Sequence, residues 1–214
     1  MQIFWHGYTS VRIEAKTGDT ECTVLTDPFE NETSLRFPRT LQPDLVVLSH
    51  QNRKMFNLEA LQNTPFIVSD PGEYEVKGVF VTGIQDKQKD EGKERPVIYR
   101  MTAEGMNLGF LGSLKRAPTE AELAELGNID ILLLATGGAD WMDAKTAAEI
   151  IAEIEPRMVI PLSYDIPGLK AKLGSIDAFC KQLGSCQREN ATRLKIAKKD
   201  LPADNLVVAV LERA

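Results

Sequence analysis

The stretch Asp44-Leu-Val-Val-Leu-Ser-His50-Gln-Asn52-Arg-Lys54 decides how the rest of this chain is interpreted. Its run from Leu45 to Leu48 is continuously apolar, which is typical of a β-strand buried on both faces. The run ends at His50, and residues 56–61 shortly after it are compatible with a helix. Because α/β proteins place their sites at corners between a strand and the following helix, we expect a functional site beside His50.

Short segments on both sides of this corner carry strand or helix patterns and are separated by turns that contain Gly or Pro. The predicted strands are 2–6, 10–15, 21–26, 66–69, two within 73–82, 97–101, 107–111, 129–134, 158–162 and 206–211, and the predicted helices begin at Thr119, Asp143 and Ile176. The mostly polar residues 86–95 are expected to form an exposed hairpin loop. Strand meanders followed by strand–helix units, which occur twice, predict an α/β fold of two mixed sheets with helices outside.

Composition predicts one globular domain over residues 1–214, because 43% of the residues are hydrophobic and 26% are charged. No apolar run approaches the roughly 18 residues that a membrane span needs. The start Met1-Gln-Ile-Phe-Trp-His6 lacks the basic and apolar parts of a signal peptide. We therefore expect a cytoplasmic protein with no membrane partner. The formal net charge of −6 argues against a nucleic-acid partner, because phosphate binding relies on clustered Lys and Arg.

The chain has three cysteines, Cys22, Cys180 and Cys186, and none of them stands in a C-x-x-C arrangement. In the expected cytoplasmic setting, this pattern predicts reduced structural thiols. A Cys180–Cys186 disulfide and a redox role are the alternatives.

Several motifs, in this order, resemble the metallo-β-lactamase superfamily, specifically its small Zn-dependent hydrolase branch of ascorbate-6-phosphate lactonase-like proteins. They are Thr26 to Phe29, Leu45 to His50, Asp70 to Val79, Leu111-Gly112, Thr136 to Gly138 with Met142 to Ala144, and Val159 to Tyr164. The resemblance runs from about Ile3 to Leu211. It implies a four-layer αββα sandwich of the metallo-β-lactamase type, and a binuclear zinc site built from seven side chains.

The seven positions that the resemblance assigns to zinc ligands carry mostly other side chains here. The first motif, His-x-His-x-Asp-His in such relatives, supplies four of them, and a loop histidine, a bridging aspartate and a final histidine supply the others. In this chain they read His50, Asn52, Lys54, Met55, Gln88, Ser113 and Ser163. One ligand in seven remains.

Zinc requires imidazole, thiolate or carboxylate donors, usually three or four per ion, and the chain has two histidines, His6 and His50. The ammonium group of Lys54 would repel a divalent cation placed near it. Without a metal ion, the water activation on which the family's hydrolysis depends is lost. The sequence therefore predicts no metal, no cofactor and no catalytic residue, and a degenerate family member that acts as a binding or scaffold protein.

The alternative is a hydrolase that acts on a small ester, lactone or phosphorylated metabolite through a non-standard or metal-independent site. His6 could join His50 as a ligand, or carboxylates such as those of Asp27, Glu73 and Asp165 could converge on His50. Acyl transfer without a metal would use His50 as the base, with Ser113 or Ser163 as the nucleophile oriented by Asp27. Against that role, we expect Asp27 to cap or orient backbone.

Basic residues beside His50 also allow an anion site in the space that the metal ions would have occupied. Arg53 and Lys54 follow His50 directly, and lysine and arginine bind phosphate well. The candidate residues for this ligand site are His50, Asn52, Lys54, Ser113 and Ser163. The partner would be a small anion or an unidentified protein, and a homo-oligomer is a further possibility.

Overall fold

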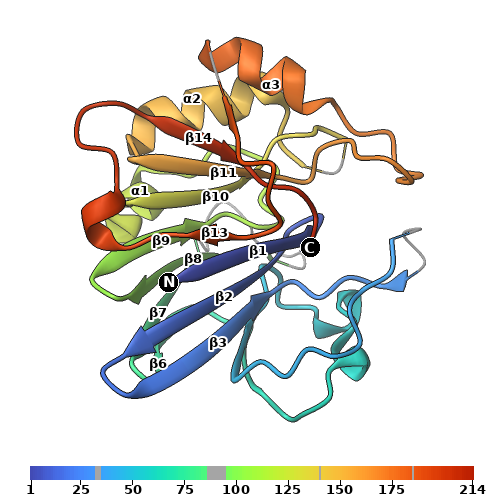
Figure 1. The fold of residues 1–214 in the computed structure, drawn as a ribbon, viewed down its shortest axis with the longest axis vertical. Coiled ribbons are helices and arrows are strands. Elements are labelled where there is room, and N and C mark those ends of the chain that lie inside the picture. Colours follow the sequence, from blue (N-terminus) through green and yellow to red (C-terminus); the bar gives the residue numbers. More distant parts are fainter. Residues whose placement is uncertain (32–34, 86–94, 140, 185) are drawn as a thin grey trace.

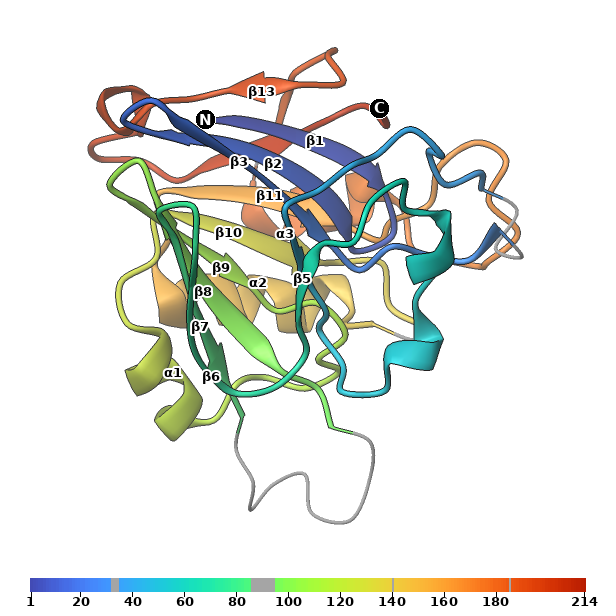
Figure 2. The same ribbon diagram turned by 90° about the horizontal axis from the view of Figure 1, so that it is seen from below.

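Two β-sheets lie face to face in the computed structural model, which describes residues 1–31, 35–85, 95–139, 141–184 and 186–214 (Figures 1 and 2). The six-stranded sheet has the order β13-β1-β2-β3-β4-β5, and the eight-stranded sheet has the order β12-β14-β11-β10-β9-β8-β7-β6. The first sheet consists of β1 (Gln2–Gly7), β2 (Ser10–Thr17), β3 (Thr20–Thr26), β4 (Leu45–Val47), β5 (Phe66–Val68) and β13 (Leu194–Lys195). The second consists of β6 (Gly72–Val76), β7 (Val79–Ile84), β8 (Ile98–Ala103), β9 (Met106–Phe110), β10 (Ile131–Ala135), β11 (Met158–Leu162), β12 (Gln187–Arg188) and β14 (Val207–Val210).

Each sheet contains both parallel and antiparallel pairs, so both are mixed, as predicted. Strands β1, β2 and β3 form an antiparallel meander, and β4 and β5 then add to it in parallel. In the second sheet, β6 to β9 are antiparallel, whereas β9, β10, β11 and β14 are parallel. The α/β class is confirmed.

The position of strand β4 between two apolar clusters explains why its sequence is apolar without interruption. Leu45 and Val47 pack into the core between the two sheets, whereas Val46 and neighbouring Leu48 pack into a second apolar cluster on the outer face of the six-stranded sheet. All four side chains are fully buried. The second cluster is completed by Tyr8 and by apolar residues of the segments that follow β3 and β4, namely Phe29, Leu35, Phe37, Leu41, Phe56, Leu58 and Leu61.

The α-helices lie on the side of the sandwich opposite the second apolar cluster. Helices α1 (Glu120–Leu126), α2 (Ala144–Ile154) and α3 (Ile176–Leu183) lie outside the eight-stranded sheet (Figure 2). The predicted caps are present, because the Asp143 side chain accepts a hydrogen bond from the Thr146 amide and Thr119 forms a capping box with Glu122.

The prediction of a helix at 56–61 was wrong. The chain there forms two single turns of 3-10 helix, at Arg53–Met55 and Leu58–Ala60. Asn52 begins the first turn by accepting a hydrogen bond from the Lys54 amide. Asparagine side chains offer such local partners, and a segment this short has too few backbone bonds to sustain an α-helix. Irregular chain and 3-10 turns therefore form the outer layer over the six-stranded sheet.

The prediction of reduced thiols was also wrong for two of the three cysteines. Cys180 and Cys186 form a disulfide, whereas Cys22 is a buried free thiol. The turn after α3 brings the two Cα atoms to 5.4 Å, within the range that a disulfide spans. The sequence separation alone could not show this.

Two further expectations concern the loop and the membrane. The predicted loop at 86–95 lies outside the described residues, apart from Arg95. Across the part of the chain that the structure describes, none of the helices is long and apolar enough to cross a membrane.

Candidate functional site

A hydrogen-bonded corner forms where β3, β4 and β9 end. Asp27 follows β3 directly, and its carboxylate is buried. The Ser49 amide donates to Asp27 Oδ1 (2.7 Å) and the Ser49 hydroxyl donates to Asp27 Oδ2 (2.6 Å). The predicted orienting role of Asp27 is thereby confirmed, because its carboxylate holds the backbone after β4 against the end of β3.

Ser113 joins the same corner from the end of β9. Its amide donates to Ser49 Oγ (2.9 Å) and its hydroxyl donates to the Ser49 carbonyl (2.8 Å). Gly112 allows this close approach, since its φ is +46° and a Cβ at this position would lie 2.0 Å from Ser49 Cβ. The three strand ends therefore form one rigid unit.

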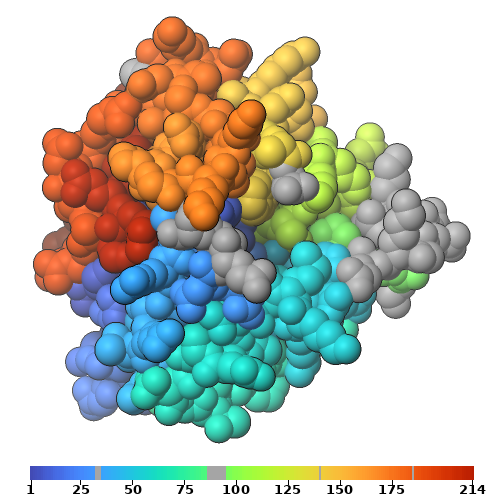
Figure 3. All heavy atoms as spheres, turned by 90° about the vertical axis from the view of Figure 1, so that its right-hand side faces the viewer, coloured from blue at the N-terminus to red at the C-terminus, as the bar shows by residue number. Residues whose placement is uncertain are grey.

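A cavity of about 210 Å³ opens above this corner. Its described lining residues are Tyr8, Thr9, Asp27, Phe29, Glu30, Ser49, Met55, Phe56, Ser113 and Trp141. The ring of Tyr8 lies with its centroid 5.4 Å from those of both Phe29 and Trp141. Figure 3 shows the face on which the chain near Phe29 (blue), the 3-10 turns (cyan) and residues 165–173 (orange) come together.

Of the five residues predicted to form an anion site, the structure places Ser113 in the lining of this cavity. His50 is buried, and its Nδ1 accepts a hydrogen bond from the Asn52 amide (3.1 Å). Lys54 is exposed on the 3-10 turn that Asn52 begins. Ser163 is buried at the end of β11, where its amide donates to the Tyr8 carbonyl (3.1 Å). Gln88 lies outside the described residues.

Arg53, the basic residue next to Lys54 in the sequence, is held outside the described lining of this cavity. Arg53 Nε donates to Ser69 Oγ (3.0 Å), and Ser69 in turn donates to the Asp70 carboxylate (3.0 Å). Neither Arg53 nor Lys54 is among the described residues that line the cavity. The cavity therefore differs from the anion site that the sequence suggested.

The described residues do not fit a zinc ion. Among residues 1–31, 35–85, 95–139, 141–184 and 186–214, no three His, Cys, Asp or Glu side chains gather closely enough to hold a metal. At the corner itself, the Ser49 hydroxyl bonds to Asp27 and the Ser113 hydroxyl bonds to the Ser49 carbonyl, and hydroxyls are poor zinc ligands. Both Asp27 oxygens already accept hydrogen bonds from Ser49.

Burial disfavours the charged forms of Asp27 and His6, so it moves the pKa of the acid up and the pKa of the base down. It raises the pKa of Asp27 to about 6, and the hydrogen bonds from Ser49 only partly offset this. It lowers the pKa of His6 in β1 to about 4, in spite of a contact between His6 Nδ1 and the Ala214 carbonyl (3.5 Å). His6 Nε2 has no hydrogen-bond partner in the described part of the chain. His6 is thus a buried neutral histidine.

These two shifts predict opposing pH dependences of stability. Between pH 4 and 6.5 the unfolded chain binds more protons at His6 than the folded one, so His6 makes stability rise with pH. Between pH 3.8 and 6 the folded chain binds more protons at Asp27, so Asp27 makes stability fall with pH. Each contribution is about 3 kcal/mol across its window.

Urea unfolding at a series of pH values checks this opposition. Relative to the wild type, the Asp27→Asn protein should gain stability as the pH rises from 4 to 6.5, whereas the His6→Gln protein should lose it. Parallel curves for all three proteins would contradict the assignment.

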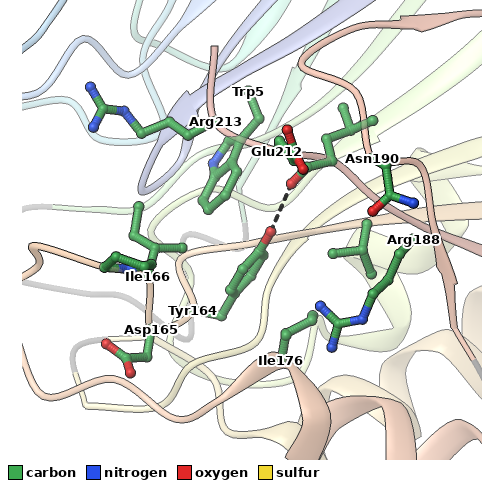
Figure 4. A pocket seen from close by; sticks show the side chains of 12 residues that line it. Trp5, Tyr164, Asp165, Ile166, Ile176, Arg188, Asn190, Glu212 and Arg213 are labelled. Carbon is green, nitrogen blue, oxygen red and sulfur yellow. Dashed lines mark hydrogen bonds between the residues drawn. The ribbon is translucent and has the colours of Figure 1, made fainter.

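A second and larger cavity, of about 450 Å³, lies between β1, α3 and the C-terminal segment (Figure 4). Trp5 and Tyr164 form its wall with ring centroids 4.6 Å apart, and the Tyr164 hydroxyl donates to the Leu211 carbonyl (3.0 Å). Arg188 and Asn190 reach toward it from β12 and the loop after it. The sequence did not predict this cavity, because the two-residue strand β12, which carries Arg188, has no apolar alternation.

Comparison with known proteins supports the fold assignment. A family model described as a beta-lactamase superfamily domain matches residues 2–163. A UPF0173 protein of Pyrococcus furiosus is 24% identical over 189 residues, which cover 77% of this chain and 83% of the relative. A UPF0173 protein of Pyrococcus abyssi is 22% identical over 209 residues, which cover 86% and 90%.

Comparison with solved structures also supports the fold assignment. A protein from Thermotoga maritima, assigned as a Zn-dependent hydrolase of the metallo-β-lactamase superfamily, is 27% identical, covers 99% of this chain and 100% of its own, and has a TM-score of 0.79. Igni18, a metallo hydrolase from Ignicoccus hospitalis, shares the fold with 15% identity, 86% and 90% coverage, and a TM-score of 0.60. The chain therefore belongs to the metallo-β-lactamase superfamily.

Proposed function

We propose that residues 1–214 form one metallo-β-lactamase-fold domain that binds a small ligand in the cavity above Asp27 and Ser113, without a resident metal ion. The observation that carries this proposal is what the side chains do at the positions that correspond to the family's metal ligands. Ser113 locks β9 to Ser49, and Asn52 begins a 3-10 turn. Both side chains thus have structural partners, and Ser113 also lines the cavity.

The chemistry of the corner supports binding over hydrolysis. A bound metal ion would bring the pKa of a water molecule near neutrality, and the hydroxyl groups at the corner have no comparable effect. Asp27 is the buried carboxylate of the cavity, and its oxygens are already engaged by Ser49. The Ser113 hydroxyl donates to the Ser49 carbonyl, and His50 Nδ1 accepts from the Asn52 amide, which argues against a base–nucleophile pair of His50 and Ser113.

Metal content tests the proposal directly. After equilibration with Zn²⁺, Mn²⁺ or Fe²⁺ and removal of free ions, the purified chain should hold well below one ion per molecule, as measured by elemental analysis. The Thermotoga maritima protein, treated in parallel, is one control. A variant that carries Asn52→His, Lys54→Asp, Met55→His, Ser113→Asp and Ser163→His is the other, and it should gain metal if these positions face one space. One or two tightly bound ions in the wild-type chain would overturn the proposal.

A second candidate function is hydrolysis of a small ester, lactone or phosphorylated metabolite through a non-standard or metal-independent site. The likeness to the Thermotoga maritima protein over the whole of both chains favours it. A panel of such substrates, assayed with and without added metal ions, distinguishes the two functions. Turnover by the wild type that disappears in Ser113→Ala would establish the hydrolase, whereas equal rates would exclude Ser113 as the nucleophile.

Binding of a small anion through His50, Asn52, Lys54, Ser113 and Ser163 stays a prediction, as do a protein partner and a homo-oligomer.

A further inference from the structure

The charge of the cavity above Asp27 and Ser113 indicates which ligands it accepts. Its described lining residues include two acidic ones, Asp27 and Glu30, and no Lys, Arg or His. An anion in this space would lie close to two acidic groups inside a chain of net charge −6. Electrostatics therefore favours a cation.

Aromatic rings form much of the remaining wall. Tyr8, Phe29, Phe56 and Trp141 all line the cavity, and the Tyr8 ring packs against the rings of both Phe29 and Trp141. The faces of such rings carry negative potential and attract cations within about 6 Å of the ring centroid. The combination of rings and carboxylates suits a ligand that is both positively charged and apolar at its surface.

The backbone at Tyr8 is held in an uncommon conformation that places this ring. Tyr8 has a φ of 48°, which L-residues other than asparagine and aspartate seldom adopt. Its carbonyl accepts two hydrogen bonds, from Trp5 Nε1 (2.9 Å) and from the Ser163 amide (3.1 Å). These hydrogen bonds therefore hold the Tyr8 ring at the cavity, although the backbone conformation of Tyr8 is energetically unfavourable.

We propose that this cavity binds a small organic cation of the quaternary or methylated ammonium class, an inference that rests on the ligand-binding function proposed above. The volume of about 210 Å³ limits the ligand to a few carbon atoms. Each Asp27 oxygen already accepts a hydrogen bond from Ser49, so Asp27 acts on the ligand mainly through its charge. A quaternary ammonium has no N–H and requires no hydrogen-bond acceptor, whereas a protonated primary amine has three N–H donors to satisfy.

Choline and its uncharged isostere 3,3-dimethyl-1-butanol test the inference. They have nearly the same shape and differ by the positive charge. By isothermal titration calorimetry at pH 7.5, choline should bind at least about tenfold more tightly than the alcohol. Tetramethylammonium should compete with choline, and inorganic phosphate should not.

Substitutions of Trp141 test whether choline binds in this cavity. Trp141→Ala should weaken choline binding by about tenfold or more, and Trp141→Phe, which restores a ring, should recover part of it. Phe80→Ala removes an exposed ring of β7 that does not line the cavity and should leave choline binding unchanged. Circular dichroism establishes that each variant is folded.

The outcomes separate this inference from the function on which it rests. Equal affinity for choline and the alcohol, or binding of phosphate in place of choline, would overturn the cation inference and leave a ligand-binding protein. Tight metal binding with metal-dependent turnover would overturn the proposed function itself. Choline binding that persists unchanged in Trp141→Ala would place the cation elsewhere and refute this site.

Discussion

Gly112→Ala is expected to destabilise the protein by about 3 to 5 kcal/mol, or to prevent folding altogether. The new Cβ would lie 2.0 Å from Ser49 Cβ and 2.5 Å from Ser49 Oγ, at a backbone φ of +46° that favours glycine. Ser49 cannot move aside without breaking its hydrogen bonds to Asp27 and Ser113. Soluble expression and the midpoint of urea unfolding measure the effect.

Gly18→Ala is the matched control for this variant. Gly18 also has a positive φ, +61°, but an added Cβ would meet no atom within 4 Å. Its expected cost is therefore the conformational part alone, about 1 to 2 kcal/mol. If Gly112→Ala were no more destabilising than Gly18→Ala, the close approach between Gly112 and Ser49 would be refuted.

Asp27→Ala is expected to lower the free energy of unfolding by about 2 to 4 kcal/mol, because it leaves two buried donors of Ser49 without their acceptors. Asp27→Asn keeps one acceptor oxygen and removes the buried charge, so its cost should be smaller. Urea unfolding followed by circular dichroism at pH 7.5 compares the two.

Asp204→Ala is the control for these Asp27 variants, since Asp204 lies exposed before β14. Its cost should stay within about 0.5 kcal/mol. Similar unfolding midpoints for Asp27→Ala and Asp204→Ala would show that the Asp27–Ser49 bonds contribute nothing to stability. A larger loss in Asp27→Asn than in Asp27→Ala would contradict the stabilising role assigned to an acceptor oxygen at this position.

Helix α2 and strand β4 illustrate how local patterns predicted the fold. Asp143 could be identified as a cap, and Ala147, Ile150 and Ile151 as a buried stripe, because both features depend on spacing within one turn or two. The unbroken apolar run of β4 likewise required burial on both faces. The 3-10 turns after Asn52 were not predicted, because short apolar segments do not distinguish a helix from a turn.

The cavity illustrates what such patterns leave out. Tyr8 and Trp141 lie far apart in the sequence, and no local pattern joins them. Lys54 lies close to His50 in the sequence, yet it is exposed on a 3-10 turn and is not among the described lining residues. Nearness along the chain was therefore a poor guide to nearness in the site.

The sequence by itself determined most of the strands and helices in their order along the chain, except the short strands β12 and β13 and the 3-10 turns after Asn52. It also determined which side chains stand at the positions resembling metal ligands. Each of these follows from local periodicity, from capping or from residue identity. Only the tertiary structure decided that Asp27, Ser49 and Ser113 form one hydrogen-bonded corner beneath aromatic rings, and that Cys180 meets Cys186. The physical reason is that such contacts depend on how whole strands and the chain between them pack, and no local pattern encodes that packing.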